Sequence, residues 1–172
     1  MPDAIGSSDP GALRDAFLLS MRRLASAVTI ITTGTRDKPL GMTASAVSSL
    51  SADPPSILVC VNRSASIHGA LAMGNRFCVN LLGEEHADLS FLFGGKAAPE
   101  DRFNTGAWDY DHVPYLRDGQ ANLHCVVDLL VDYGSHSIVV GKVDAVRIGG
   151  PVRPLIYGDG RFIPAGAPAS AA

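Results

Sequence analysis

The chain has 172 residues, of which 47% are hydrophobic and 18% charged, with a formal net charge of -3 and a pI near 5.9. This balance is that of a folded globular protein, and the length suits one well-buried domain. The weak negative charge and the lack of a lysine or arginine run argue against nucleic-acid partners. We expect a flexible N-terminus at 1–12, one domain at 13–163 and a flexible C-terminal tail at 164–172.

Cysteines and apolar runs bear on the cellular location. Cys60, Cys78 and Cys125 lie singly in apolar, strand-like segments, and the sequence has neither a C-x-x-C pair nor histidines at ligand spacing. Such cysteines are typical of a reduced core, and no metal site is predicted. Residues 1–11 lack the pattern of a signal peptide, and the longest apolar runs are far below the roughly 20 residues of a membrane helix. We expect a soluble cytoplasmic protein with no membrane partner.

The first half of the chain mixes one clear helix with strand signals. Asp9-Pro10 is typical of a helix N-terminus, and apolar residues then recur at helical spacing from Leu13 to Leu24. The β-branched run at 27–34 and the following turn predict a hairpin with the 41–55 stretch. The remaining expected elements are a strand at 56–63, a short helix at 66–73, a strand at 76–82, a short helix at 84–93, a long functional loop at 94–120, two strands joined at Gly134-Ser135, and a small hairpin around Asp159-Gly160.

Alternation within the strands predicts which faces are buried. In 76–82 it places Phe77, Val79 and Leu81 on one side, and in 123–131 the odd-numbered apolar residues alternate with a more polar series. Antiparallel strands with helices between them favour a mainly β fold with helical insertions, a β-barrel, over an alternating parallel sheet. No dinucleotide-binding glycine motif, P-loop or G-x-S-x-G elbow is present.

The stretch GMTASAVSSLSADPP at 41–55 is unusually rich in small and hydroxyl side chains for a strand region. Small side chains let a flat ligand approach the backbone, and hydroxyls beside backbone N–H groups can hold a phosphate without a cation. A phosphorylated planar ligand would use both properties. An edge strand with its serines facing solvent explains the same pattern, and the sequence leaves the two interpretations open.

The longer segment GMTASAVSSLSADPPSILVCVNRSASIHGAL resembles the signature region of the short-chain flavin reductases, the reductase components of two-component flavin-dependent monooxygenases. The resemblance continues through RFCVNLL, EDRF-x-TG, GSHSIVVGKV and RPLIYGDGRF and covers roughly residues 14–163. It implies an FMN-binding split β-barrel, usually a homodimer, that binds FMN or FAD and oxidises NADH or NADPH.

The resemblance also implies site residues. His136 is the candidate catalytic residue near the nicotinamide, in a GSHS segment where the family has G-D-H-T. The implied flavin-binding residues are Thr43, Ala44, Ser45, Ser48 and Ser49, with Asn62 and Ser66 at the phosphate end and Arg161 and Phe162 near the cofactors. Ser66 could also cap the 66–73 helix, whose positive end favours a phosphate, and capping alone is its alternative role. The alternatives are a plain turn residue for His136 and a simple hairpin end for Arg161 and Phe162.

The implied reaction is hydride transfer from nicotinamide C4 to flavin N5, which needs no dedicated acid or base. The reduced flavin would then pass to a partner monooxygenase. A flavin-binding module without turnover on the same barrel is the alternative. An oxidase acting on a pyridoxal phosphate is disfavoured because the arginine cluster expected there is missing. The choices between FMN and FAD and between NADH and NADPH remain open.

Overall fold

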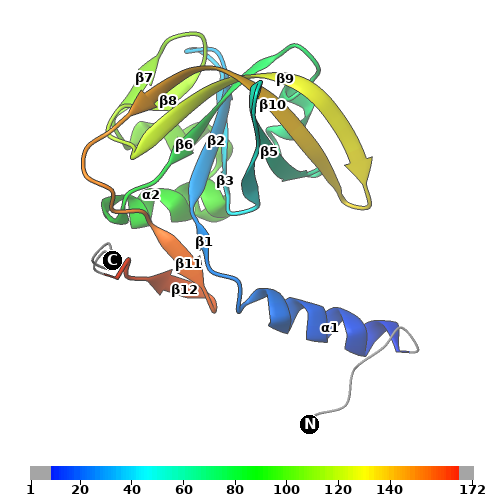
Figure 1. Cartoon of the computed structure of the whole chain (residues 1–172). Helices are drawn as coiled ribbons and strands as arrows, with labels where there is room; N and C mark the ends of the chain where they lie inside the picture. Colours follow the sequence, from blue (N-terminus) through cyan, green and yellow to red (C-terminus); the bar gives the residue numbers. More distant parts are fainter. Residues whose placement is uncertain (1–8, 167–172) are drawn as a thin grey trace.

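The computed structural model describes residues 9–166, which form a curled sheet with short helices at one end and one projecting helix (Figure 1). Of the flexible ends predicted at 1–12 and 164–172, residues 1–8 and 167–172 lie outside the described residues, and Pro10–Ala12 belong to the first helix. The elements are α1 (Pro10–Met21), β1 (Ser26–Ala27), β2 (Thr29–Gly34), β3 (Pro39–Ala44), β4 (Val47–Ala52), β5 (Pro55–Asn62), η1 (His68–Ala70), β6 (Arg76–Leu81), η2 (Glu84–His86), α2 (Ala87–Phe91), η3 (Leu92–Lys96), η4 (Pro99–Asn104), β7 (Trp108–Tyr110), β8 (Pro114–Leu116), β9 (Ala121–Tyr133), β10 (His136–Ile148), β11 (Ile156–Gly158) and β12 (Arg161–Ile163).

Seven antiparallel strands make the main sheet in the order β3-β2-β6-β9-β10-β5-β4. The sheet curls so that β3 contacts β5, while its edge strands β3 and β4 do not pair with each other. Smaller sheets β1-β11-β12 and β7-β8 flank it. The arrangement confirms the mainly β split barrel with helical insertions. No helix within residues 9–166 has the length and apolar character needed to cross a membrane.

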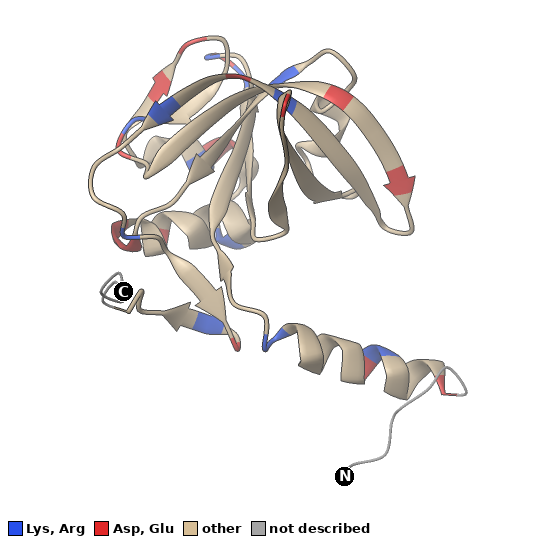
Figure 2. Ribbon diagram, viewed as in Figure 1, with Lys and Arg blue, Asp and Glu red and all other residues tan. Residues whose placement is uncertain are grey.

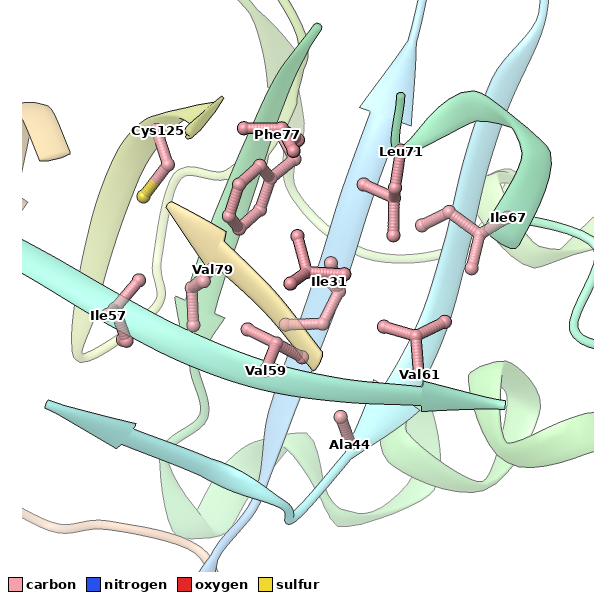
Figure 3. Packing of buried hydrophobic residues seen from close by; sticks show 12 residues of the cluster. Ile31, Ala44, Ile57, Val59, Val61, Ile67, Leu71, Phe77, Val79 and Cys125 are labelled. Atoms are coloured by element: carbon pink, nitrogen blue, oxygen red, sulfur yellow. The ribbon is translucent and has the colours of Figure 1, made fainter. Parts of the chain in front are cut away.

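The barrel interior is filled by apolar side chains from both halves of the sheet (Figure 3). Phe77 of β6 lies against Gly141 of β10, on the far side of β9, and an added Cβ at Gly141 would meet the ring at 2.3 Å, so close packing here requires glycine. The labelled members of this cluster are Ile31, Ala44, Ile57, Val59, Val61, Ile67, Leu71, Phe77, Val79 and Cys125.

The 94–120 region is more ordered than the long loop that its sequence predicts. It contains η4 and the β7–β8 hairpin, and the only tryptophan belongs to a second core cluster. Trp108 packs against Phe93 and Phe103, with ring centroids 5.1 and 4.9 Å away. Each of these elements has only a few residues, which is too short for a hydrophobic repeat to be recognised in the sequence.

Burial differs from the alternation pattern in two strands. In β6 both series are buried, since Cys78 and Asn80 are as inaccessible as Phe77 and Val79. In β9 His124, from the more polar series, is buried, whereas Leu129 and Val131 from the apolar series are half exposed, because the distal part of the β9–β10 hairpin extends beyond the barrel (Figure 1).

The predicted N-terminal helix is confirmed as α1, with the Asp9 side chain accepting a hydrogen bond from the Ala12 N–H and proline at the first turn. Its apolar side chains are nevertheless unburied within the protomer: none of the α1 residues is buried, and Phe17 is 57% exposed. The local pattern therefore identified the helix but not what covers it.

The three cysteines are free thiols, as expected. Burial raises the pKa of the Cys125 thiol to about 12 and also raises that of Cys78 well above its usual value. Both thiols therefore stay protonated and act as small apolar core residues. The last predicted turn is also confirmed, because Asp159 and Gly160 both adopt positive φ between β11 and β12.

A buried amide joins four strands. Asn80 donates to the Ile30 carbonyl at 2.8 Å, and its Oδ1 accepts from the Leu116 N–H at 2.8 Å and from Asn122 at 3.0 Å. These bonds link β2, β6, β8 and β9 where the polar groups have no access to water.

Replacing Asn80 with alanine is expected to lower the free energy of unfolding by about 3 kcal/mol, because several buried partners lose their hydrogen bonds together. Urea denaturation would measure the change. The control is Asn104→Ala, which removes one exposed hydrogen bond to Asp101 and is expected to cost no more than about 0.5 kcal/mol. Equal losses in both variants would contradict a structural role for the Asn80 network.

Candidate active site

The end of β3 is covered by the segment from α2 to η4. An added Cβ at Gly41 would lie 2.5 Å from the Phe93 ring, so the ring rests directly on the strand backbone. Arg102 donates from Nη1 to the Gly41 carbonyl at 2.8 Å, and the Thr43 hydroxyl donates to the Ser90 carbonyl. These contacts hold the covering segment in place beside the strand.

Three adjoining cavities follow this junction. The first, which we call the loop cavity, has a volume of about 350 Å³. The second, the aromatic cavity, has about 240 Å³, and the third, the helix cavity, about 490 Å³. Thr43 and Gly94 border both the loop and aromatic cavities, and Ser45 and Tyr157 border both the aromatic and helix cavities. The three cavities therefore adjoin one another, and we call them together the trough.

Polar groups gather in the loop cavity. Asn62 Oδ1 accepts from the Ser64 N–H at 2.9 Å and from the Ser64 hydroxyl at 2.8 Å, which fixes the bend of the loop after β5. Ser64 and Ser66 border the cavity from this loop, and Arg102 borders it from η4. Because Ser64 donates both its N–H and its hydroxyl proton to Asn62, the cavity offers the Ser66 hydroxyl and one guanidinium, a donor pair suited to a phosphate.

Aromatic side chains wall the second cavity. The Phe91 and Phe162 rings lie 5.0 Å apart, Tyr157 lies 5.7 Å from Phe162, and the Lys96 ammonium lies 4.1 Å from the centre of the Phe91 ring. Val28, Thr43, Ser45, Ser90 and Gly94 complete the lining. A wall of rings opposite small side chains is the shape that a planar aromatic ligand needs.

Four of the residues that the resemblance implied border the trough, namely Thr43, Ser45, Ser66 and Phe162. Asn62 lies behind the loop and shapes it. These five residues come from β3, the β3–β4 turn, the end of β5, the loop after it and β12, so the fold brings together segments that are distant in sequence.

The other implied flavin-binding residues lie elsewhere. Ala44 is buried in the barrel core, and Ser48 and Ser49 are exposed on β4, the edge strand, as the solvent-facing alternative predicted. Arg161 is exposed on β12. None of these four borders the trough within this protomer.

The structure corrects the helix expected at 66–73. Only η1 forms, a single 3-10 turn whose N-cap is Ile67 and which has no side-chain cap, so Ser66 does not cap it. A turn of three residues carries too little dipole to favour a phosphate. Ser66 therefore contributes only its own hydroxyl and backbone to the loop cavity.

His136 begins β10 and is exposed, with Nδ1 2.9 Å from the Ser135 hydroxyl. It does not border the trough, but it pairs with Asn62 across the β5–β10 ladder, so the two side chains lie on the same face of the sheet. The candidate nicotinamide residue therefore stands beside the residue that shapes the loop cavity.

Sequence reasoning missed Ser64, Phe91, Tyr157 and Arg102 as lining residues. The EDRF segment that contains Arg102 was noticed as part of the resemblance, but no role was assigned to the arginine. Its guanidinium reaches the cavity only because η4 folds back on β3, a contact that joins positions 61 residues apart. Local patterns do not reveal such a contact.

Comparison with known proteins relates this chain to a family. Residues 21–166 match the family described as the flavin reductase like domain. The chain is 41% identical over 151 residues to FMN reductase (NADH) RutF of Variovorax paradoxus, covering 87% of this chain and 84% of that protein. It is 36% identical over 158 residues to the reductase component of the FADH(2)-dependent resorcinol hydroxylase of Rhizobium sp., covering 89% and 88% respectively.

A solved structure agrees with the sequence matches. The NADH:FAD oxidoreductase of Streptomyces globisporus, in complex with NAD and FAD fragments, superposes with a TM-score of 0.82 at 27% identity, covering 99% of this chain and all of that chain. The extent of the family match, the identity to curated relatives and the shared fold agree, and the chain belongs to the flavin reductase family.

Proposed function

We propose that this protein is an NADH-dependent flavin reductase, and the trough along β3 is the observation that carries the proposal. The aromatic cavity suits the flavin ring, and the loop cavity next to it offers Ser66 and Arg102 to the phosphate. The shared wall at Thr43 places a ring site beside an anion site, as a phosphorylated planar ligand requires. The residues present therefore fit a flavin.

The protein's own side chains bind and orient the two cofactors. Phe91, Tyr157 and Phe162 provide an apolar wall for the ring site, and Thr43 is fixed by its bond to the Ser90 carbonyl. Arg102 neutralises the phosphate while it braces Gly41. When both cofactors are bound, they supply the reaction itself, hydride transfer from nicotinamide C4 to flavin N5. The protein's contribution is to hold the two rings in reactive alignment, with His136 on the nicotinamide side.

The relatives guide the cofactor and partner assignments. One relative is named as an FMN reductase using NADH, and another as the reductase component of an FADH(2)-dependent hydroxylase. We assign NADH as the donor, with FMN or FAD as the acceptor, and a flavin-dependent monooxygenase as the partner that takes the reduced flavin. The free thiols of Cys60, Cys78 and Cys125 support a reducing, cytoplasmic location.

We assign a homodimer as the working form. The apolar side chains of α1 have little cover within the described part of the protomer, with Phe17 57%, Leu19 55% and Met21 45% exposed. Figure 2 shows α1 projecting from the barrel with few charged residues along it. An apolar surface of this kind is the mark of an interface, and α1 also borders the helix cavity, so a second copy would seat beside the trough.

The first test is reduction of the flavin under anaerobic conditions. Mixing the protein with NADH and FMN, or with NADH and FAD, is expected to bleach the nicotinamide and flavin absorbance bands together, and much more slowly without protein. Comparing the two flavins identifies the preferred acceptor. If the flavin binds but neither band changes with NADH or NADPH, the reductase function is wrong and the protein is a non-catalytic flavin-binding module.

Arg102 provides a test of the phosphate end. Arg102→Gln is expected to raise the Kd for FMN about tenfold, because a charge-assisted hydrogen bond to phosphate is lost, and to leave the Kd for riboflavin, which has no phosphate, within about twofold. Flavin fluorescence titration measures both constants. Arg36→Gln is the control, since Arg36 is exposed and stacked 4.5 Å from the Tyr110 ring, away from the trough. Equal weakening of FMN and riboflavin would show that Arg102 acts only by bracing Gly41.

The dimer is tested on α1. Phe17→Asp is expected to convert the wild-type dimer into a folded monomer, because it places a charge on the apolar side of a helix that has no buried residues in the protomer. Size-exclusion chromatography with light scattering measures the mass. Arg14→Asp, a charge change at an exposed polar position of the same helix, is the control and should stay dimeric. A monomeric wild type would refute the assignment.

A further inference from the structure

A buried serine hydroxyl connects two segments beside the predicted nicotinamide residue. Ser137 is fully buried, its hydroxyl donates to Asp132 Oδ1 at 2.5 Å, and it lies 2.8 Å from His68 Nε2. Because the serine proton is given to the carboxylate, the hydroxyl oxygen is left to accept from the imidazole. His68 therefore carries its proton on Nε2, and the three side chains form one chain of donors and acceptors.

These three hydrogen-bonded side chains fix the turn that precedes His136. Asp132 and Ser137 are cross-strand partners in β9 and β10, on either side of the turn. The turn is tied to the loop after β5 at a further point, since the Arg63 N–H donates to the Ser135 carbonyl at 2.9 Å. The guanidinium of Arg63 also lies 3.9 Å from Asp132.

His68, at the other end of this hydrogen-bonded series, follows the loop that borders the loop cavity. His68 lies in η1, directly after the segment that presents Ser64 and Ser66. Ile67 and Leu71, on either side of it, are inserted into the barrel core with Val61, the β5 partner of Ser137 (Figure 3). The core thus fixes His68, and His68 in turn fixes Ser137.

We propose that Ser137 and His68 are positioning residues for hydride transfer. The inference rests on the proposed reductase function. Through Asp132, they clamp the His136 turn onto the loop that borders the phosphate end, so that the nicotinamide side and the flavin side of the site share one rigid frame. Neither residue borders the trough, and neither is given a proton-transfer role.

The primary variant is Ser137→Ala, which removes the central hydroxyl. It is expected to lower kcat/KM for NADH about tenfold, since a small misplacement of one reactant is costly, while the Kd for FMN stays within about twofold. Ser137→Thr keeps a hydroxyl and is expected to recover most of the loss. His68→Phe removes the donor at the other end and is expected to reproduce the alanine phenotype.

A double-mutant cycle separates positioning from general damage. If Ser137 acts through His136, Ser137→Ala adds less than about a twofold loss in a His136→Asn background. Thr33→Val is the control for stability, because it removes a different buried hydroxyl, the one that donates to the Arg76 carbonyl. It is expected to lower Tm as Ser137→Ala does without changing kcat/KM for NADH.

Hydrogen exchange gives a readout that does not depend on turnover. Ser137→Ala is expected to speed amide exchange about tenfold both in the 133–137 turn and in the 63–68 loop, because the bonds joining them are lost, whereas Thr33→Val leaves both segments unchanged. Exchange that rises in the turn alone would overturn the clamp.

The kinetic outcomes distinguish the two claims. If the wild type reduces flavin and Ser137→Ala matches it with NADH, or if its effect is fully additive with His136→Asn, the positioning role is wrong and the reductase function stands. If the wild type reduces neither flavin, the reductase function and the positioning role both fail, and exchange then decides only whether the clamp is structural.

Discussion

The direct contact between β3 and the segment that covers it is the constraint from which the site follows. Gly41 has no Cβ, so the Phe93 ring can rest on the strand, and Arg102 can reach the Gly41 carbonyl. The Thr43 hydroxyl then meets the Ser90 carbonyl. Thr43 is thereby fixed where it lines both the aromatic cavity and the loop cavity.

The parts of the fold that the sequence predicted are those governed by short-range chemistry. The Asp9-Pro10 start of α1, the β2–β3 hairpin and the Asp159-Gly160 turn each depend on residues within a few positions of one another. The family resemblance added the barrel and four of the residues that border the trough. The motifs of the family follow one another along the sequence, and in the fold several of them lie beside β3.

The parts that sequence reasoning missed depend on contacts between distant positions. Ser45 and Ser48 have the same side chain three positions apart, yet Ser45 borders the trough and Ser48 lies on an exposed edge strand, because the chain turns between β3 and β4. The turn could not be recognised in the sequence because small residues precede and follow it as well. Likewise, Trp108 packs against Phe93 and Phe103, which come from the separate elements η3 and η4.

The polar side chains of the site serve mainly to hold backbone and loops. Thr43 bonds to a carbonyl, Asn62 closes the loop that carries Ser64, and Ser137 links a strand to η1. An enzyme that moved protons would need at least one titratable group aimed at its ligand. A reaction carried by two cofactors needs instead a frame that does not yield, since ring alignment is the quantity that the protein controls. The distribution of hydrogen bonds around β3 and β10 is that of such a frame.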